Sequence, residues 1–343
     1  MLSKLNQLRL SLKLFDPSRY WYQRTFSFFS LPLLPLAWLF GFIVMLRRFL
    51  YRHGIMSSYT FSVPTIIVGN ITVGGTGKTP FVIWLAHYLT EQGYAPGIVT
   101  RGVGGILSNT PHFVQLSDLP QRVGDEAILL QKSVRCPVVI CKNKVAAVRA
   151  LLQQYPCDVV ISDDGLQHYR LGRHIEIAII DEQRGFGNKH LLPAGPLREP
   201  IKRLKQVTFQ VINGNTKEAT MSVEARHLVS LYDEETKQFL TNFAHQTVHA
   251  VAAIGHPERF FSALRKAGLK VIPHIFPDHY LFKEEDFKFD DRLPIIMTEK
   301  DATKCRTFAD ERYWYLGIAV KISPIFAQDL LQTLKNAGGP SCD

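Results

Sequence analysis

The stretch "VGNITVGGTGKTPF", residues 68–81, is the strongest indication of the fold of this chain. It contains the glycines, lysine and threonine of a loop that cradles nucleotide phosphates, namely Gly74, Gly75, Gly77, Lys78 and Thr79. The usual spacing of such a loop would place a glycine at Thr72. Upstream, "PTIIVG" has the β-branched composition of a buried strand, and downstream "TPFVIWLAHYLTEQG" has apolar residues at helical spacing. Because strand, loop and helix follow in the required order, we predict a phosphate-binding loop.

Each part of this loop has an expected task. The backbone N–H groups from Gly74 through Thr76 to Gly77 are expected to face the phosphates of a nucleotide. Lys78 is expected to reach the β and γ phosphates, and the Thr79 hydroxyl to bind Mg²⁺.

The positive charge of the chain is concentrated at its N-terminus. The 343 residues carry a net charge of +10, and residues 1–52 hold eight Lys and Arg against one acidic residue, Asp16. The rest of the chain is nearly balanced, so the charge does not favour a nucleic-acid partner.

The same N-terminal segment contains "FSFFSLPLLPLAWLFGFIVML", residues 26–46, which has no charged residue. As a helix it would be about 31 Å long, close to the thickness of a bilayer core. Pro32, Pro35 and the basic residues at both ends favour a helix that lies in the interface, and spanning stays open. We expect residues 1–52 to anchor the protein to a membrane surface; packing on the protein's own core is the alternative.

Four further apolar runs, separated by polar or helical stretches, predict more strands of a parallel sheet: "APGIVTRG", "CPVVIC", "CDVVISDDG" and "IEIAIID". We therefore predict an α/β fold of the P-loop NTPase type, with a mainly parallel sheet and helices on both faces. After a turn at Asn213, "MSVEARHLVSLYD" is typical of an antiparallel strand, and a strand, a helix and a strand follow. The expected domains are residues 53–211 for the nucleotide and 212–343 for a smaller α/β domain that closes the cleft.

Several polar residues could act beside the loop. Asp163 and Asp164 end one predicted strand and are the preferred magnesium ligands, with Asp181 as a rival at the end of another. Asp125 precedes an apolar helix, where an acidic residue is also favoured by the helix dipole alone. His279 lies in a polar gap between apolar residues, and a lone histidine is more often structural than catalytic.

Taken together, these motifs resemble one family, the tetraacyldisaccharide 4'-kinases (lipid A 4'-kinases) of Gram-negative bacteria. The motifs that carry the resemblance are, in order, "GNITVGGTGKTP", "VTRGVGG", "VGDEAILL", "SDDGLQHYRL", "DEQRGFGNKHLLPAGPLREP", "AIGHPERFFSAL", "FPDHYLF" and "MTEKDATKC". The family's own loop has this form, so Thr72 is no departure from it. The resemblance extends to about residue 305.

The resemblance implies transfer of the ATP γ-phosphate to the 4'-hydroxyl of an acylated glucosamine disaccharide 1-phosphate, with Mg²⁺, at the cytoplasmic face of the inner membrane. It implies no nucleic acid and no obligate protein partner. Asp125 with His279 resembles the proposed catalytic pair, and Lys78 and Thr79 serve the nucleotide and metal. Asp163 and Asp164 lie in the metal-side motif. The resemblance also places three residues around the site, with Glu199 expected at the metal, Arg101 expected at the nucleotide, and Arg198 beside them.

A membrane-associated ATPase of the partitioning or assembly class is the alternative, although such proteins often carry a lysine where this chain has Val73.

Overall fold

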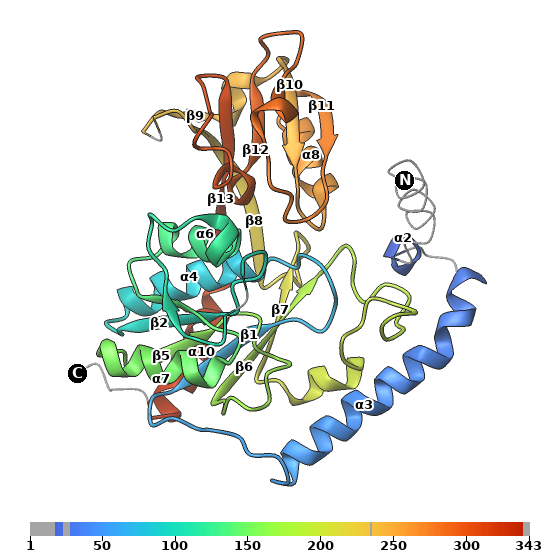
Figure 1. The fold of residues 1–343 in the computed structure, drawn as a ribbon, viewed down its shortest axis with the longest axis vertical. Coiled ribbons are helices and arrows are strands. Elements are labelled where there is room, and N and C mark those ends of the chain that lie inside the picture. Colours follow the sequence, from blue (N-terminus) through green and yellow to red (C-terminus); the bar gives the residue numbers. More distant parts are fainter. Residues whose placement is uncertain (1–17, 23–27, 107, 234, 339–343) are drawn as a thin grey trace, which may run out of the picture.

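The computed structural model describes residues 18–338 except 23–27, 107 and 234. Within these residues, one sheet of thirteen strands runs through two lobes, which are stacked along the long axis of the molecule (Figure 1). We call the part built on strands β1 to β7 the first lobe and the part built on β8 to β13 the second lobe.

The sheet of the first lobe is parallel except at one edge. Strand β1 (Thr65–Gly69) lies at its centre, between β5 (Val159–Ser162) and β6 (Ile175–Asp181). The remaining strands are β2 (Pro96–Thr100), β4 (Val138–Ile140) and β7 (Phe209–Asn213), with the short antiparallel β3 (His112–Phe113) at the edge. The four strands expected after β1 are thus confirmed, and β7, which ends at the predicted turn at Asn213, adds one more.

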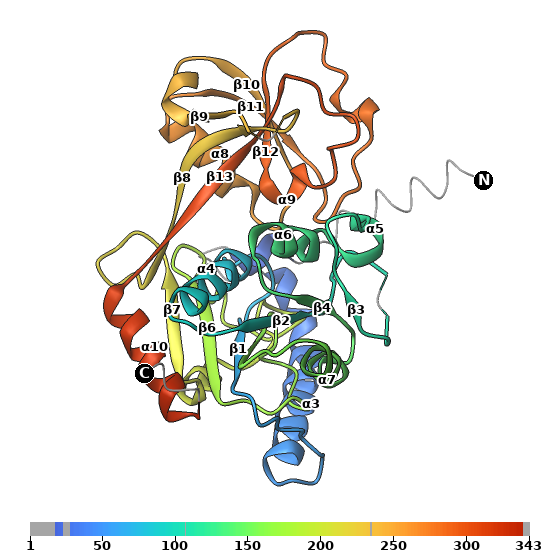
Figure 2. The same cartoon turned by 90° about the vertical axis from the view of Figure 1, so that its left-hand side faces the viewer.

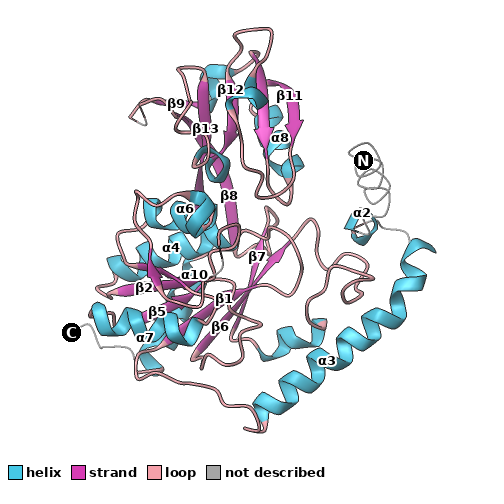
Figure 3. Ribbon diagram, viewed as in Figure 1, coloured by secondary structure: helices cyan, strands magenta, loops and turns pink. Residues whose placement is uncertain are grey.

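Alternating side chains of these strands pack against helices on both faces. Ile66 and Val68 share one core with α4 (Lys78–Glu91) and α6 (Asp125–Ser133), while Ile67 points to the opposite core with α7 (Lys144–Gln154). Figure 3 shows this layering of helices on strands. The predicted α/β architecture is confirmed. Shorter helices complete the lobe, namely α5 (Pro120–Val123) and η2 (Ile201–Gln206).

The second lobe is a smaller α/β unit, as its strand, helix and strand pattern predicts. Its parallel strands are β10 (Thr247–Ala252), β11 (Lys270–Ile275), β12 (Ile295–Thr298) and β13 (Tyr313–Ile322). Helix α8 (Pro257–Lys266) covers one face, and α9 (Glu299–Ala302) lies on the other. Strand β8 (Met221–Ser230) runs antiparallel to β13, as predicted, and pairs with β9 (Lys237–Phe239). Two short helices, η3 (Leu240–Phe243) and η4 (Glu284–Phe287), complete it.

The last helix does not follow the expected division at residue 212. Strand β13 carries the chain back to the first lobe, where α10 (Pro324–Asn336) places Phe326, Leu330 and Leu334 in the core that contains Phe81 (Figure 2). The sequence does not reveal this return, because an amphipathic helix fits either lobe equally well.

Helix α3 (Leu34–Arg52) lies along the outside of the first lobe, preceded by α2 (Ser18–Trp21) and η1 (Phe28–Leu33). Its buried residues are Ala37 and Gly41, and a Cβ at Gly41 would lie 2.7 Å from Leu191 Cδ1. Its opposite face exposes large apolar side chains, namely Leu36, Trp38, Leu39, Phe42, Ile43, Met45, Leu46 and Phe49. By length and composition, residues 30–52 could cross a membrane. Residues 1–17 of the expected anchor lie outside the described residues.

Candidate functional site

The loop between β1 and α4 has the backbone that a phosphate cradle requires. Gly74 and Gly77 adopt φ values of 99° and 93°, which favour glycine. A Cβ at Gly77 would collide with the Asn213 amide, which donates to the Thr76 carbonyl over 2.9 Å. Lys78 Nζ lies 3.2 Å from Asn70 Oδ1 and 3.5 Å from Asp164 Oδ1. The loop is thus held in shape by neighbouring side chains, with Lys78 at its mouth.

Asp163 is a buried carboxylate at the end of β5. Its Oδ2 accepts a hydrogen bond from Thr100 Oγ1 over 3.2 Å, whereas its buried Oδ1 has no hydrogen-bond partner among the described residues. Burial, with Glu126 and Asp164 nearby, raises the pKa of Asp163 to about 6. Such a group is stabilised in its charged form by a cation.

Asp164 has a different environment from its neighbour. Its backbone is left-handed, with φ 48°, and its carboxylate lies 3.2 Å from Arg198 Nη1 as well as near Lys78. Burial works against its ionisation, but Lys78 and Arg198 outweigh this and hold its pKa well below the ordinary value. The rival, Asp181, pairs instead with Arg259 over 3.3 Å. Of the three aspartates, Asp164 therefore contacts Lys78, and Asp163 adjoins it with an unused oxygen.

These residues fit Mg²⁺ only if a nucleotide completes its shell. In the part of the chain that the structure describes, no cluster of three or more His, Cys, Asp or Glu side chains could hold a metal ion alone. Magnesium is commonly held by one or two protein groups together with phosphate oxygens and water. The unpartnered oxygen of Asp163 and the hydroxyl of Thr79, the second residue of α4, are suitable donors.

Two other residues expected around the site have surroundings that the sequence does not specify. Glu199, only 1% exposed, accepts hydrogen bonds from Gln167 and Tyr169 and pairs with Arg203. Gln167 also donates to the Asn70 carbonyl in the phosphate loop. Glu199 therefore supports the loop indirectly, through Gln167. Arg101 follows β2, and its buried Nε makes no hydrogen bond to any described residue.

Asp125 and His279 meet across the two lobes. Asp125 is the first residue of α6, and His279 lies in the loop between β11 and η4. His279 Nδ1 lies 3.0 Å from Asp125 Oδ1 and 3.1 Å from Oδ2. His279 has a φ of 62°, a strained conformation for a side-chain-bearing residue and one that concentrates at functional sites. A Cβ at Gly104 would lie 2.6 Å from His279 Nδ1, so the loop after β2 also packs on the pair.

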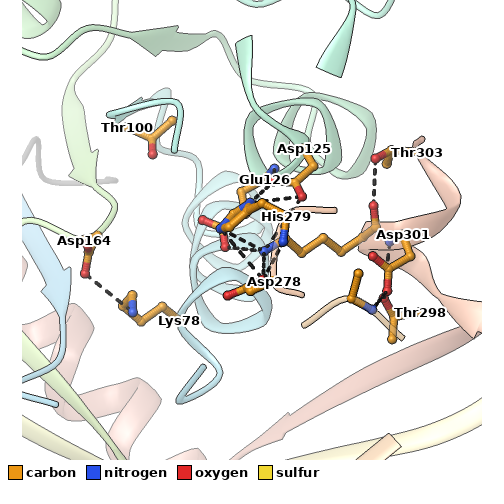
Figure 4. A network of polar contacts seen from close by, with 12 residues as sticks. Lys78, Thr100, Asp125, Glu126, Asp164, Asp278, His279, Thr298, Asp301 and Thr303 are labelled. Carbon is orange, nitrogen blue, oxygen red and sulfur yellow. Dashed lines mark hydrogen bonds and ion pairs between the residues drawn. The ribbon is translucent and has the colours of Figure 1, made fainter. Parts of the chain in front are cut away.

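Two lysines that sequence reasoning missed surround this pair. Lys300 Nζ lies 3.1 Å from Glu126, 3.3 Å from Asp278 and 3.5 Å from His279 Nε2. Lys304 Nζ lies 3.4 Å from Asp125 Oδ2. Figure 4 shows Asp125, Glu126, Asp278 and His279 gathered in one cluster, with Lys78 and Asp164 in another. Only the motif "MTEKDATKC" signalled these lysines, and it suggested no role for them.

The cations and the hydrogen bond shape the charge of the pair. Burial opposes ionisation of Asp125, but the hydrogen bond from His279 and the charges of Lys300 and Lys304 lower its pKa below the ordinary value. In turn, the hydrogen bond to Asp125 raises the pKa of His279. The arrangement therefore favours a carboxylate at Asp125 and a donating N–H at His279 Nδ1.

Arg184 is a second cation at the phosphate loop that the sequence did not predict. A Cβ at Gly74 would lie 2.8 Å from Arg184 Nη1, which is buried and has no hydrogen-bond partner among the described residues. The guanidinium lies 3.8 Å from the centroid of the Tyr22 ring, and the Tyr22 hydroxyl donates to the Val73 carbonyl over 2.9 Å. Arg184 is thus fixed against the loop by a residue that follows α2.

A cavity of about 460 Å³ opens on the other side of the loop from Asp163. Its wall includes Asp181 and Asn213, at the ends of β6 and β7, and residues of α8 in the second lobe. Arg259 of α8 pairs with Asp181 and donates to Asn213 Oδ1 over 3.0 Å. Since Asn213 also bonds to Thr76, the cavity adjoins the phosphate loop.

Comparisons with known proteins show which proteins the chain resembles over most of its length. A family model described as tetraacyldisaccharide-1-P 4'-kinase matches residues 29–335. The tetraacyldisaccharide 4'-kinase of Nitrosococcus oceani is 45% identical over 324 residues, 93% of this chain and 94% of that protein. That of Methylobacillus flagellatus is 47% identical over 320 residues, 92% and 95% of the two chains. A crystal structure of "apo" form LpxK from Aquifex aeolicus in complex with ATP is 27% identical, with a TM-score of 0.75, and covers 90% of this chain and 99% of that one.

Proposed function

The chain belongs to the tetraacyldisaccharide-1-P 4'-kinase family, and from this premise we propose how its two lobes share the reaction. It is an ATP-dependent kinase of lipid A biosynthesis, which transfers the ATP γ-phosphate to the 4'-hydroxyl of a tetraacyldisaccharide 1-phosphate. We assign phosphate binding to the first lobe, and removal of the acceptor's proton to a pair that both lobes build.

The nucleotide lies along the loop with a defined direction. Because β1 lies between β5 and β6, the loop has the two aspartates on one side and the cavity on the other. We place adenosine in the cavity, whose volume suits a ligand of that size, and the γ-phosphate toward Asp163. Lys78 then exchanges Asn70 and Asp164 for phosphate oxygens, and Arg184 supplies a second cation from the side of Gly74.

The enzyme uses Mg²⁺, and we assign it to Thr79 and Asp163. When bound there, the ion would offset negative charge on the phosphate oxygens. Asp164 holds Lys78 and Arg198 in place, and Glu199 supports the loop through Gln167.

Asp125 accepts the proton of the acceptor hydroxyl. Phosphoryl transfer has a loose transition state, so a carboxylate that orients the hydroxyl and takes its proton late is sufficient, even with a low pKa. His279 donates its Nδ1–H to this carboxylate and so fixes its direction. Because the two residues come from different lobes, the pair is complete only while the lobes are together.

Helix α3 supplies the surface for a lipid acceptor. One face of the helix packs on the first lobe, and its exposed apolar face is available for insertion into a bilayer. A helix held against its own protein along one side cannot be surrounded by lipid, so we propose that α3 lies in the interface. The basic residues of the N-terminus favour an anionic lipid surface, and they support our proposal that the enzyme acts at the cytoplasmic face of the inner membrane of a Gram-negative bacterium.

The observation that carries this proposal is the 3.0 Å contact between Asp125 and His279 beside a phosphate loop. The test is incubation of the protein with γ-labelled ATP, Mg²⁺ and tetraacyldisaccharide 1-phosphate in detergent. Labelled lipid that requires both Asp125 and His279 supports the assignment. Release of free phosphate without labelled lipid would instead favour the ATPase alternative.

A further inference from the structure

The segment "MTEKDATK", residues 297–304, contributes two lysines to the site without a role assigned to either. It begins in β12 and continues through α9, where the Thr298 side chain caps the helix by accepting from Asp301 N. Lys300 and Lys304 are four positions apart, and both side chains reach toward Asp125 on the first lobe. The two lysines have different surroundings, which indicate different roles.

The ammonium of Lys300 contacts several polar groups where the two lobes meet. Its side chain is 14% exposed, and its ammonium contacts Glu126, Asp278 and His279 at 3.1 to 3.5 Å but Asp125 only at 3.9 Å. It therefore balances carboxylates of both lobes, Glu126 of the first and Asp278 of the second.

Lys304 is a buried cation between two carboxylates. Only 2% of its side chain is exposed, and its Nζ lies 2.9 Å from Asp301 Oδ1 and 3.4 Å from Asp125 Oδ2. The ammonium also lies 5.2 Å from the centroid of the Phe282 ring. A lysine is costly to bury unless its charge is compensated. Lys304 therefore depends on the neighbouring carboxylates, and its burial indicates a role.

Asp301 alone does not explain why Lys304 is buried at this position. Its Oδ2 already accepts hydrogen bonds from Ala253 N over 3.0 Å and from Thr298 Oγ1 over 2.7 Å. These bonds fix Asp301 within the second lobe, and its other oxygen, Oδ1, pairs with Lys304. The ammonium also lies 3.4 Å from Oδ2 of Asp125, a carboxylate of the first lobe.

The contacts around Asp125 divide between its two oxygens. Oδ1 accepts from Glu126 N over 2.9 Å and lies nearest to His279, whereas Oδ2 faces Lys304. The charged groups that face this carboxylate are His279, Lys300 and Lys304, and the carboxylates of Glu126 and Asp278 face Lys300 in turn. His279 and Lys304 therefore hold the carboxylate from the second lobe.

We propose that Lys304 is a positioning residue, which fixes the Asp125 carboxylate in the direction that accepts the acceptor's proton. The inference rests on the proposed role of Asp125. In this proposal, the second lobe holds the Asp125 carboxylate at two points, through the hydrogen bond from His279 and through the buried charge of Lys304.

The test compares three full-length variants, Asp301→Asn, the double variant Asp301→Asn with Lys304→Met, and Asp125→Asn. The double variant removes both charges of the buried pair, because Lys304→Met alone would leave Asp301 uncompensated in the core. Its Asn oxygen can still accept from Ala253 and Thr298. Thermal unfolding and ATP binding establish that each variant is folded.

We expect kcat of the double variant to fall about 10- to 100-fold at neutral pH, as for a displaced catalytic group, with little change in the KM for ATP. The acidic limb of its kcat/KM profile should move to higher pH, since Asp125 has lost a cation that favours its charged form. Asp301→Asn alone, which keeps Lys304, should retain the parent's acidic limb.

Two outcomes would overturn the role of Lys304. One is a folded double variant with the parent's pH profile and kcat, and the other is the same shift of the acidic limb in Asp301→Asn alone. If Asp125→Asn is inactive in either case, the proposed base survives while the Lys304 inference fails. An Asp125→Asn enzyme with the parent's activity would overturn the proposed function itself.

Discussion

His279 Nδ1 lies 3.0 Å from Asp125 Oδ1, although 154 positions separate the two residues and each belongs to a different lobe. The contact joins the start of α6 to the strained loop that follows β11. Its hydrogen bond changes the pKa of both partners in opposite directions. The pair therefore links the charge of the base to the position of the lobes.

The pH dependence of stability should report this pair. The hydrogen bond to Asp125 raises the folded-state pKa of His279 above its ordinary value of about 6.5. The stabilisation is thus fully present below pH 6.5 and is lost as pH rises through the raised pKa. We expect His279→Ala to lower the melting temperature more at pH 6 than at pH 9. A difference that grows toward pH 9 would contradict this, and Asp125→Asn should also flatten the dependence.

Lys78→Ala should abolish most of the transfer. The substitution removes the cation that faces the phosphates, and loss of one such group costs about 10² to 10³ in kcat. Asp164 would keep Arg198 as a partner, so the fold should survive. Turnover measured beside the melting temperature checks this, and unchanged turnover would remove Lys78 from the site. Thr79→Ala should instead raise the Mg²⁺ concentration that half-maximal activity requires.

Arg184→Met should weaken the use of ATP. A charge-assisted hydrogen bond contributes about 1.5 to 3 kcal/mol, so kcat/KM for ATP should fall about 10- to 100-fold. Tyr22→Phe is the matched control, because it keeps the ring under Arg184 and removes only the hydroxyl bonded to Val73. Its effect should be small. An Arg184→Met enzyme with the parent's kcat/KM would show that this cation does not contact the phosphates.

The outer face of α3 should bind vesicles. Replacing Leu39, Phe42 and Leu46 by Gln removes three exposed apolar side chains, and burial of each would contribute about 1.5 to 3 kcal/mol. We expect at least a tenfold loss of partitioning to anionic vesicles, with an unchanged melting temperature. Gln at Tyr232 and Phe239, exposed apolar residues of the second lobe, is the matched control. Equal loss in both variants would argue against insertion through α3.

The sequence predicts well what depends on local order. The loop glycines, the strand before them and the helix after them are contiguous, and the ends of parallel strands place Asp163 and Asp164 beside Lys78 by topology alone. The relation of Asp125 to His279 came only from a family resemblance, since neither spacing nor periodicity relates residues so far apart.

What the sequence does not predict depends on long-range packing. Lys300 and Lys304 come from the second lobe and reach Asp125 on α6, while Arg184 lies against both Gly74 and the ring of Tyr22. Glu199 reads as a metal ligand, yet its oxygens are occupied by Gln167 and Tyr169, which lie thirty or more residues away in the chain. Helix α10 rejoins the first lobe through strand β13, a path that no local pattern records.

The most direct test of the account is the turnover of Asp125→Asn, His279→Ala and the double variant at saturating ATP and acceptor, with ATP binding measured separately. We expect kcat to fall by about 10² to 10⁴ for Asp125→Asn while ATP affinity changes little. His279→Ala should be damaging, and the double variant should lose much less than the product of the single losses, because the residues act as one unit. Multiplicative losses would mean that the two residues act independently. An Asp125→Asn enzyme within a few-fold of the parent would contradict the account and leave Asp125 as a residue of the helix start.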